Sequence, residues 1–336
     1  MKHWTLAACM VSTTFAFAQP VQSQEFTWSI GFVRATGSSY VATLETVPER
    51  IAAATDGRLK IELYDTLVPG PDQPAAVRDG RLDGSFAVSP WLSAEAPYMN
   101  FGHLPGLLTD IEQYYQMLDP LLREEMASVW RDKYNSVQLA TGVFETQCII
   151  SRDELRQVSD FKGKKVRVHN TEAASLMSQL GAAPTPVNFA EIVPALQRGV
   201  VDVVMTSVGT ASGMGFPTVA KDLGLWQVGI VVPWSFVVNT QKWEELPDDL
   251  KEVVQTEFRA IEDEHFAAHE GFSQRNIDKL VSEGMTLYEP PQEVLDELFS
   301  EENVKPVYDN WYKLNEQTGT DGRALVEKIN ALKDEM

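Results

Sequence analysis

Strand and helix signals alternate along most of this chain, and this alternation constrains its fold more than any other feature. Residues 26–30 and 59–64 alternate apolar and polar side chains, which is the pattern of half-buried strands. Between them, Ser38 is placed to cap a helix with apolar residues three or four apart, and Pro48 kinks that helix or starts its second half. This order predicts parallel strands with helices on both faces, an α/β fold.

The same alternation continues to the C-terminus of the 336-residue chain. Further strands are predicted at 84–89, 137–141, 146–151, 164–168, 200–206, within 225–239, and at 284–288. Helices are predicted at 75–78, 109–133, 171–180, 189–198 and 247–280, followed by two more at the C-terminus. Asn188 and Glu191 have the spacing of a capping box, whereas the glycine-rich residues 209–215 favour a flexible turn.

A chain of this length suggests about two domains. It contains no repeat, low-complexity tract or flexible linker, so we expect two lobes woven together by crossing strands. We assign residues 19–140 mainly to the first lobe, 141–240 mainly to the second, and 241–336 to a long helix and C-terminal helices that pack across both. A cleft between such lobes, at the carboxyl ends of the strands, is the expected ligand site.

The first 18 residues have the pattern of a cleavable secretory signal. After a short basic start, residues 4–17 form an apolar stretch that is shorter than the roughly 20 residues needed to span a bilayer. The stretch ends in Ala16-Phe17-Ala18, so cleavage is predicted near Ala18, with an N-terminal core helix as the alternative. No later segment is long and apolar enough for a membrane helix. We therefore expect an exported, periplasmic protein with no direct membrane insertion.

The charge balance excludes whole classes of partner. The chain has 28 Lys and Arg residues against 48 Asp and Glu residues, a formal net charge of -20. This field repels nucleic-acid phosphates and anionic membrane surfaces, so neither is an expected partner. A local basic cleft can still bind a small anion.

The sequence lacks the motifs of catalysis and cofactor binding that we sought. It has no Walker-type phosphate loop, no dinucleotide fingerprint and no Gly-x-Ser-x-Gly elbow. His265 and His269 are spaced as zinc ligands can be, but they lie among acidic residues, and a solvated helix face is the favoured interpretation. Cys148 has no partner in the mature chain and is expected to be a small buried group. We therefore expect no cofactor, no metal ion and no enzyme.

Arg167 is the first candidate for ligand binding. It lies at the carboxyl end of a predicted strand, just before a helix that Asn170 can cap. A guanidinium and the amides of a helix start together can hold one carboxylate. The alternative is that Arg167 and the lysines at 162, 164 and 165 form a solvated basic edge, and spacing alone leaves that alternative open.

Three consecutive stretches resemble one known family. They are residues 160–168, DFKGKKVRV, residues 180–186, LGAAPTP, and residues 189–202, FAEIVPALQRGVVD. In order, spacing and residue type they resemble the solute-binding proteins of TRAP transporters, of the DctP type. Further similar stretches at 78–84 and 239–247 extend the resemblance over nearly all of the mature chain.

The resemblance implies a type II periplasmic-binding-protein-like fold, with two α/β lobes, crossing strands and a long helix spanning the lobes. It also implies a small organic acid as ligand and delivery to a permease of a large and a small membrane subunit, driven by an ion gradient. Arg167 falls on the family's carboxylate-binding arginine. Asn170 and Phe189 fall on positions that line the same pocket.

Two departures from the family pattern bear on the ligand. A second arginine found in some branches is replaced by Phe144, and an asparagine after the buried strand is replaced by Thr206. With aromatic walls, the pocket is expected to bind a monocarboxylate with an aromatic or apolar body. The remaining site candidates have three roles. Trp91 and Trp234 are expected as aromatic walls, Phe32 and Arg34 at the mouth of the pocket, and Ser89 as a polar neighbour. A ligand sensor for a membrane receptor and an exported enzyme acting on organic acids are the alternative functions.

Overall fold

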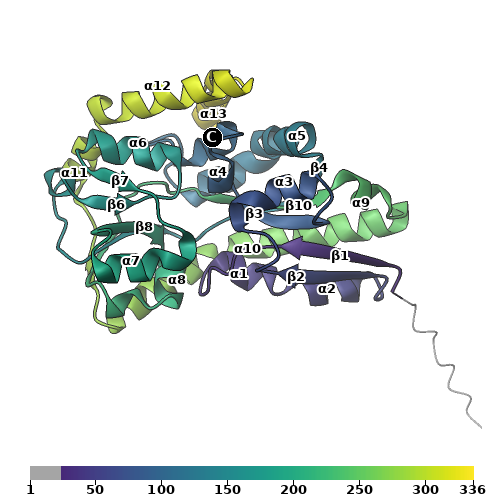
Figure 1. Ribbon diagram of the computed structural model, residues 1–336. Coiled ribbons are helices and arrows are strands. Elements are labelled where there is room, and N and C mark those ends of the chain that lie inside the picture. Colours follow the sequence, from purple (N-terminus) through teal and green to yellow (C-terminus); the bar gives the residue numbers. More distant parts are fainter. Residues whose placement is uncertain (1–23) are drawn as a thin grey trace, which may run out of the picture.

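The computed structural model describes residues 24–336, so the predicted signal at 1–18 lies outside the described residues. The described chain forms two sheets with helices packed around them (Figure 1). The first sheet has the strand order β2 (Leu59–Tyr64), β1 (Phe26–Gly31), β3 (Gly84–Val88), β10 (Pro233–Asn239), β4 (Ser136–Val143). The second has the order β11 (Thr286–Tyr288), β9 (Asp222–Gly224), β5 (Gln147–Ser151), β8 (Val203–Ser207), β6 (Lys165–Arg167), β7 (Ala183–Thr185).

Each sheet is mixed, which corrects the prediction of parallel strands throughout. β1 is parallel to β2 and β3, but β10 is antiparallel to both β3 and β4. In the second sheet β5 is likewise antiparallel to β8 and β9. The antiparallel strands are those that arrive from the other sheet. They are not placed by a strand–helix–strand unit, which is what forces neighbours to be parallel.

The chain passes between the sheets through two short segments. Residues 144–146 join β4 of the first sheet to β5 of the second, and residues 225–232 join β9 of the second sheet to β10 of the first. Each sheet is therefore built from sequence on both sides of a crossing. This is the predicted two-lobe fold with crossing strands.

The helices between the strands follow the predicted pattern with local changes. Pro48 lies in the first turn of a second helix, so the predicted alternative that it starts the second half is confirmed, with a break between α1 (Ser39–Leu44) and α2 (Val47–Ala54). The helix predicted at 109–133 is divided by a π-helical turn that contains Pro120, which has no amide hydrogen to donate. Its two parts are α4 (Ile111–Met117) and α5 (Arg123–Tyr134). The remaining helices of this part are α3 (Gln73–Arg78), α6 (Thr171–Gln179) and α7 (Ile192–Arg198).

Three local predictions are wrong. The glycine-rich segment expected to be a flexible turn forms α8 (Val208–Gly213), because the Ser207 side chain caps it by accepting from the Thr210 amide. Asn188 makes no capping hydrogen bond, and a short 3-10 turn precedes α7 instead of a capping box. Three helices, not two, follow the last strand: α11 (Gln292–Leu298), α12 (Glu301–Thr318) and α13 (Gly322–Glu335).

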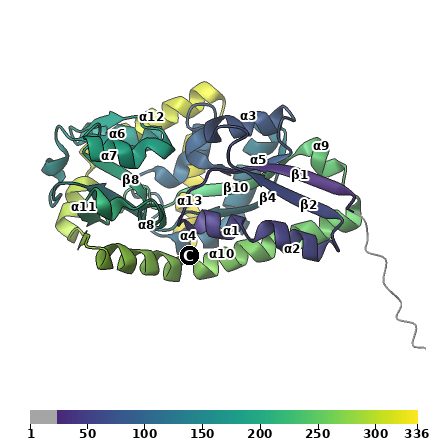
Figure 2. The ribbon, with the colours of Figure 1, turned by 60° about the horizontal axis from the view of Figure 1, so that its bottom comes forward.

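One long helix connects the two lobes. α10 (Asp248–Ser282) follows the short α9 (Thr240–Glu244), packs against α1, α2 and β4 at the first sheet, and packs against α8 at the second (Figure 2). Each sheet has an apolar cluster of its own, around Phe236 in the first and Val204 in the second, and a third cluster spans both sheets and includes Val237 and Val203. No described helix has the length and apolar character to cross a membrane.

Candidate ligand-binding site

A cavity of about 820 Å³ lies between the two lobes. The first lobe contributes the loops after β1, β2 and β3, and the second contributes the carboxyl ends of β6 and β8 and the segment before α7. Five of the ten residues predicted for the site line this cavity together: Trp91, Phe144, Arg167, Phe189 and Thr206. The position agrees with the rule that open α/β sheets bind ligands beyond the carboxyl ends of their strands.

Arg167 is the only arginine on the wall of this cavity within the described residues. It ends β6 and is 7% exposed. Its Nη1 donates to the Met205 carbonyl at 2.8 Å, while its buried Nε has no hydrogen-bond partner among residues 24–336. The alternative of a solvated basic edge is therefore wrong for Arg167, because its guanidinium is buried.

The electrostatic state of Arg167 follows from that burial. Desolvation lowers the pKa of Arg167 to about 10, and no carboxylate of the described chain forms an ion pair with it. The guanidinium still carries its charge at neutral pH. A buried cation without an anionic partner is costly, so this end of the cavity favours an incoming anion.

Asn170 supports the site from outside the cavity wall. Its side-chain oxygen accepts from the Ala173 amide at 2.8 Å and so caps α6, as predicted. Its Nδ2 is buried and unpaired within residues 24–336, and the residue does not line the cavity. The cap ties the start of α6 to the strand end that carries Arg167.

The aromatic residues reach the cavity to different extents. Trp91 lies directly over Gly70, where a Cβ would come within 2.5 Å of the indole. Phe144 is 9% exposed and stacks on Tyr40, with ring centroids 5.0 Å apart and planes at 14°. Phe189 is half-buried and packs against the clusters of both sheets. Phe144 therefore shows the cavity only part of its ring.

The structure does not bring four further predicted residues to the cavity. Trp234 is fully buried in the first sheet, where its ring packs on Gly142 and Phe86. Phe32 is 3% exposed, and its neighbours Val33 and Ala35 line the cavity instead. Ser89 and Arg34 do not line the cavity either. The hydroxyl of Ser89 is buried, and the side chain of Arg34 is exposed to solvent.

Arg34 nevertheless has an indirect link to the cavity. It forms an ion pair with Asp65 at 2.5 Å, and Asp65 lines the cavity. The guanidinium of Arg34 is thus already matched by a carboxylate, in contrast to that of Arg167.

Several polar wall residues were not identified from the sequence: His169, Gln147, Asn188, Ser207, Thr210, Asp65 and Asp72. Nε2 of His169 lies 3.2 Å from Nε2 of His103. Burial lowers the pKa of His103 to about 3, and burial together with His103 and Arg167 lowers that of His169 well below its usual value. Both rings are neutral at pH 7 and add no charge to the site. Two of these wall residues could have been found from the sequence, because His169 and Ser207 closely follow the predicted site residues Arg167 and Thr206.

The two histidines that are spaced as zinc ligands can be have another role. His265 and His269 are buried, so the prediction of a solvated helix face is wrong. Their Nε2 atoms lie 2.8 and 3.2 Å from the carbonyl oxygens of Val143 and Phe144. The described residues contain no cluster of three or more metal-ligating side chains. Cys148 is buried and unpaired, as predicted, and burial raises the pKa of its thiol.

Comparison with known proteins decides the family. The model of DctP, "bacterial extracellular solute-binding protein, family 7", matches residues 30–315. The chain belongs to the DctP family. Its relatives are solute receptors of TRAP transporters rather than enzymes.

Individual DctP relatives match along nearly their whole lengths. The sialic acid-binding periplasmic protein SiaP of Vibrio cholerae is 25% identical over 309 residues, which cover 91% of this chain and 92% of SiaP. A TRAP solute-binding protein of Desulfovibrio salexigens, solved with orotic acid, superposes with a TM-score of 0.82 at 19% identity, covering 91% and 98% of the two chains. One of Chromohalobacter salexigens, solved with D-glucuronate, gives 0.80 at 21% identity, covering 90% and 98%. These structures share the fold of this chain.

Proposed function

We propose that this receptor captures a small organic monocarboxylate with an aromatic or otherwise apolar body and delivers it to the large and small membrane subunits of a TRAP permease. Arg167 binds the carboxylate of the ligand. Thr206 donates to its second oxygen or to a bridging water, and Trp91, Phe189 and the exposed part of Phe144 enclose its body.

The observation that carries this proposal is the buried guanidinium of Arg167, which faces an interlobe cavity and has no carboxylate partner within residues 24–336. One such cation matches one carboxylate, and an arginine can bind it with two parallel hydrogen bonds. The neutral state of His169 and His103 supports a ligand with a single negative charge.

The apolar body of the ligand is supported by the ring-lined part of the wall and by the absence of a second arginine on it among residues 24–336. Orotic acid, named for the Desulfovibrio relative, is flat, whereas the D-glucuronate of the Chromohalobacter relative is a sugar acid. Aromatic faces bury a flat body well, while a sugar acid needs many hydrogen bonds. The ring-lined part of the wall therefore suits a flat body, and the polar wall residues Gln147, Asn188 and Thr210 are left to bind its polar substituents.

A thermal-shift screen of residues 19–336 tests the proposal. Benzoate, orotate, pyroglutamate and a branched 2-oxo acid are compared with glucuronate, each at graded concentrations. A ligand at a hundred times its Kd adds about 2.7 kcal/mol of stability, which raises Tm by a few degrees. We expect shifts with the flat or apolar acids and not with glucuronate. A shift with glucuronate alone contradicts the apolar body, and no shift with any acid contradicts the role of Arg167.

Periplasmic location and delivery to a permease need separate tests. N-terminal sequencing of the secreted protein should show a start just after Ala18. Uptake of the identified acid by vesicles that contain the permease should require the receptor and an ion gradient. A receptor that binds the acid but supports no uptake would favour the alternative, a ligand sensor for a membrane receptor.

A further inference from the structure

The shorter crossing between the lobes contains a buried carboxylate. Glu145 lies in the middle of residues 144–146 and is fully buried. Its Oε2 accepts from the amide of Ser39 at 2.8 Å and from the hydroxyl of Ser39 at 2.7 Å. Its Oε1 accepts from the amide of Gly209 at 3.0 Å. Three neutral donors thus satisfy the charge, and no cation within residues 24–336 forms an ion pair with it.

The donors belong to different lobes. Ser39 begins α1, which follows the first strand of the first sheet, and Gly209 lies in α8, which follows β8 of the second sheet. The two helices lie next to each other in both views of the molecule (Figures 1 and 2), and each packs against α10. One carboxylate on the connecting segment therefore binds both lobes at once.

The lobes also touch backbone to backbone beside Glu145. A Cβ at Gly213 would lie 1.9 Å from the carbonyl oxygen of Thr36, and one at Gly209 would lie 2.5 Å from that of Gly37. No side chain fits between these segments. A contact without interlocking side chains leaves the two surfaces able to rotate against each other, while interlocked side chains would resist rotation.

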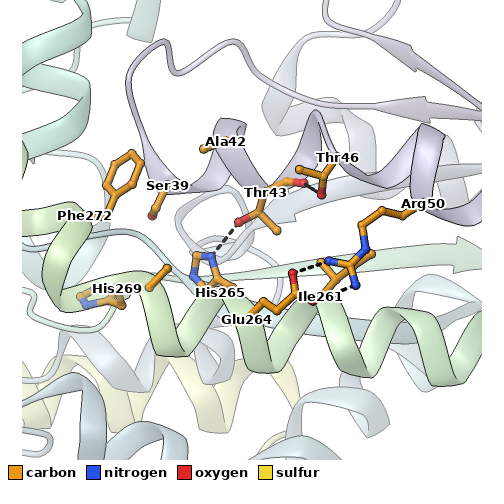
Figure 3. Close-up of a pocket in the computed structure, with 11 residues that line it drawn as sticks. Ser39, Ala42, Thr43, Thr46, Arg50, Ile261, Glu264, His265, His269 and Phe272 are labelled. Atoms are coloured by element: carbon orange, nitrogen blue, oxygen red, sulfur yellow. Dashed lines mark hydrogen bonds and ion pairs between the residues drawn. The ribbon is translucent and has the colours of Figure 1, made fainter.

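Side chains of α10 form hydrogen bonds with the backbone of the same crossing segment. His265 and His269 bind the carbonyls of Val143 and Phe144, and the Ser273 hydroxyl accepts from the Thr146 amide at 3.1 Å. These three α10 residues are spaced four apart, so they form one row along the helix. Nδ1 of His265 also forms a hydrogen bond of 2.8 Å with the Thr43 hydroxyl of α1 (Figure 3), and both residues line a cavity of about 200 Å³.

We propose that Glu145 is a positioning residue for ligand binding, and that its carboxylate is the pivot about which the two lobes close over the cavity. The pivot adjoins the ligand site, because Phe144 and Gln147 on either side of Glu145 line the cavity, as do Ser207 and Thr210 at the start of α8. The claim that Glu145 affects ligand affinity rests on the function proposed above. The claim that Glu145 sets the geometry between the lobes is independent of that function.

The first measurement needs no ligand. Spin labels on the exposed positions Lys60→Cys and Arg198→Cys, one on each lobe, report the interlobe distance in a Cys148→Ser background. We expect Glu145→Gln to broaden the distance distribution, because an amide group cannot accept from three donors as a carboxylate does. Gly213→Ala should shift the distribution outright, since its Cβ separates the two backbones. Gly271→Ala, on α10 near only the far end of Arg275, is the matched control.

The second measurement is the affinity for the best acid of the thermal-shift screen. We expect a 10- to 100-fold loss for Glu145→Gln and Gly213→Ala, and no change for Gly271→Ala. Ser39→Ala removes one donor, keeps both backbone donors, and should cost a few-fold; it serves if the stronger variants do not fold. Unchanged distance distributions in Glu145→Gln and Gly213→Ala overturn the pivot. If no acid binds the parent protein, the proposed function fails, while the distance measurement still decides the pivot.

Discussion

Arg167 and Glu145 are both charged and both buried, yet the protein surrounds them in opposite ways. Glu145 accepts three hydrogen bonds from two lobes and is fully inside the fold. Arg167 makes one hydrogen bond to a carbonyl, keeps a buried Nε without a partner among residues 24–336, and borders a cavity. The charge of Glu145 is thus compensated within the folded chain, whereas the charge of Arg167 is left for a bound anion.

This difference separates stability from function. Burying a charge costs free energy unless hydrogen bonds or an opposite charge compensate it. At Glu145 the chain recovers that cost itself, so the group should contribute to stability. At Arg167 the cost is not recovered until an anion binds, so the same physics should appear as ligand affinity.

The largest expected effect is on ligand binding at Arg167. Arg167→Ala should lose about 2–5 kcal/mol of binding free energy, roughly 30-fold to several-thousand-fold in Kd, because a desolvated charge pair is removed. Arg167→Lys should also bind more weakly, since an ammonium cannot form the forked pair. Calorimetric titration with the best acid measures both. The control is Arg198→Ala, an exposed arginine with the same change in charge; equal losses in control and test would reduce the effect to net charge.

The next effect is on stability and should have opposite signs at the two charges. Glu145→Ala leaves three donors without an acceptor, at about 1 kcal/mol or more each, so it should lower the free energy of unfolding by about 3 kcal/mol. Arg167→Ala removes an uncompensated buried charge and should leave that free energy unchanged or raise it. Urea unfolding without ligand, followed by tryptophan fluorescence, checks both. A marked loss in Arg167→Ala would break the comparison, because it would show that the fold depends on the guanidinium.

Much of the fold follows from local patterns in the sequence. The alternating residues of β1 and β2 indicated half-buried strands, and Asn170 indicated the start of α6. The orientation of β10 could not be obtained in this way. All seven of its residues are buried, so it has no alternation to show which face it turns to the core, and its antiparallel pairing depends on the distant β3 and β4.

The ligand site could also be predicted only in part. Arg167, Thr206 and Phe189 follow from strand ends and the family resemblance, because a strand's carboxyl end points to the cleft. Trp234 could not be separated from a wall residue, since an aromatic side chain fits a core and a pocket equally. The role of Glu145 could not be predicted, because its three donors belong to Ser39 and Gly209, which lie over a hundred and over sixty residues away in the sequence. Only tertiary packing brings those donors together.

Glu172 extends the comparison with a third buried ionisable side chain, whose hydrogen bonding is intermediate between that of Glu145 and that of Arg167. Its Oε1 accepts from the Thr171 hydroxyl at 2.8 Å, but its buried Oε2 has no partner within residues 24–336. Burial raises the pKa of Glu172 to about 7. The folded protein therefore keeps this proton up to about pH 7, whereas the unfolded chain releases it near pH 4.5. Rising pH consequently favours unfolding across that window, by ~2–3 kcal/mol between pH 5 and pH 8.

Glu172→Gln should remove that loss. Its unfolding free energy relative to the parent should rise by ~2–3 kcal/mol from pH 5 to pH 8, because the amide has no proton to release. The control is Glu112→Gln, which changes an exposed glutamate at the same position in the first turn of α4. The difference between variants is the quantity to measure, since it cancels the other titrating carboxylates. If Glu172→Gln and Glu112→Gln show the same pH dependence, a half-satisfied buried carboxylate behaves like an exposed one. The rule that a buried charge is costly unless it is compensated, which separates Arg167 from Glu145, would then not extend to Glu172.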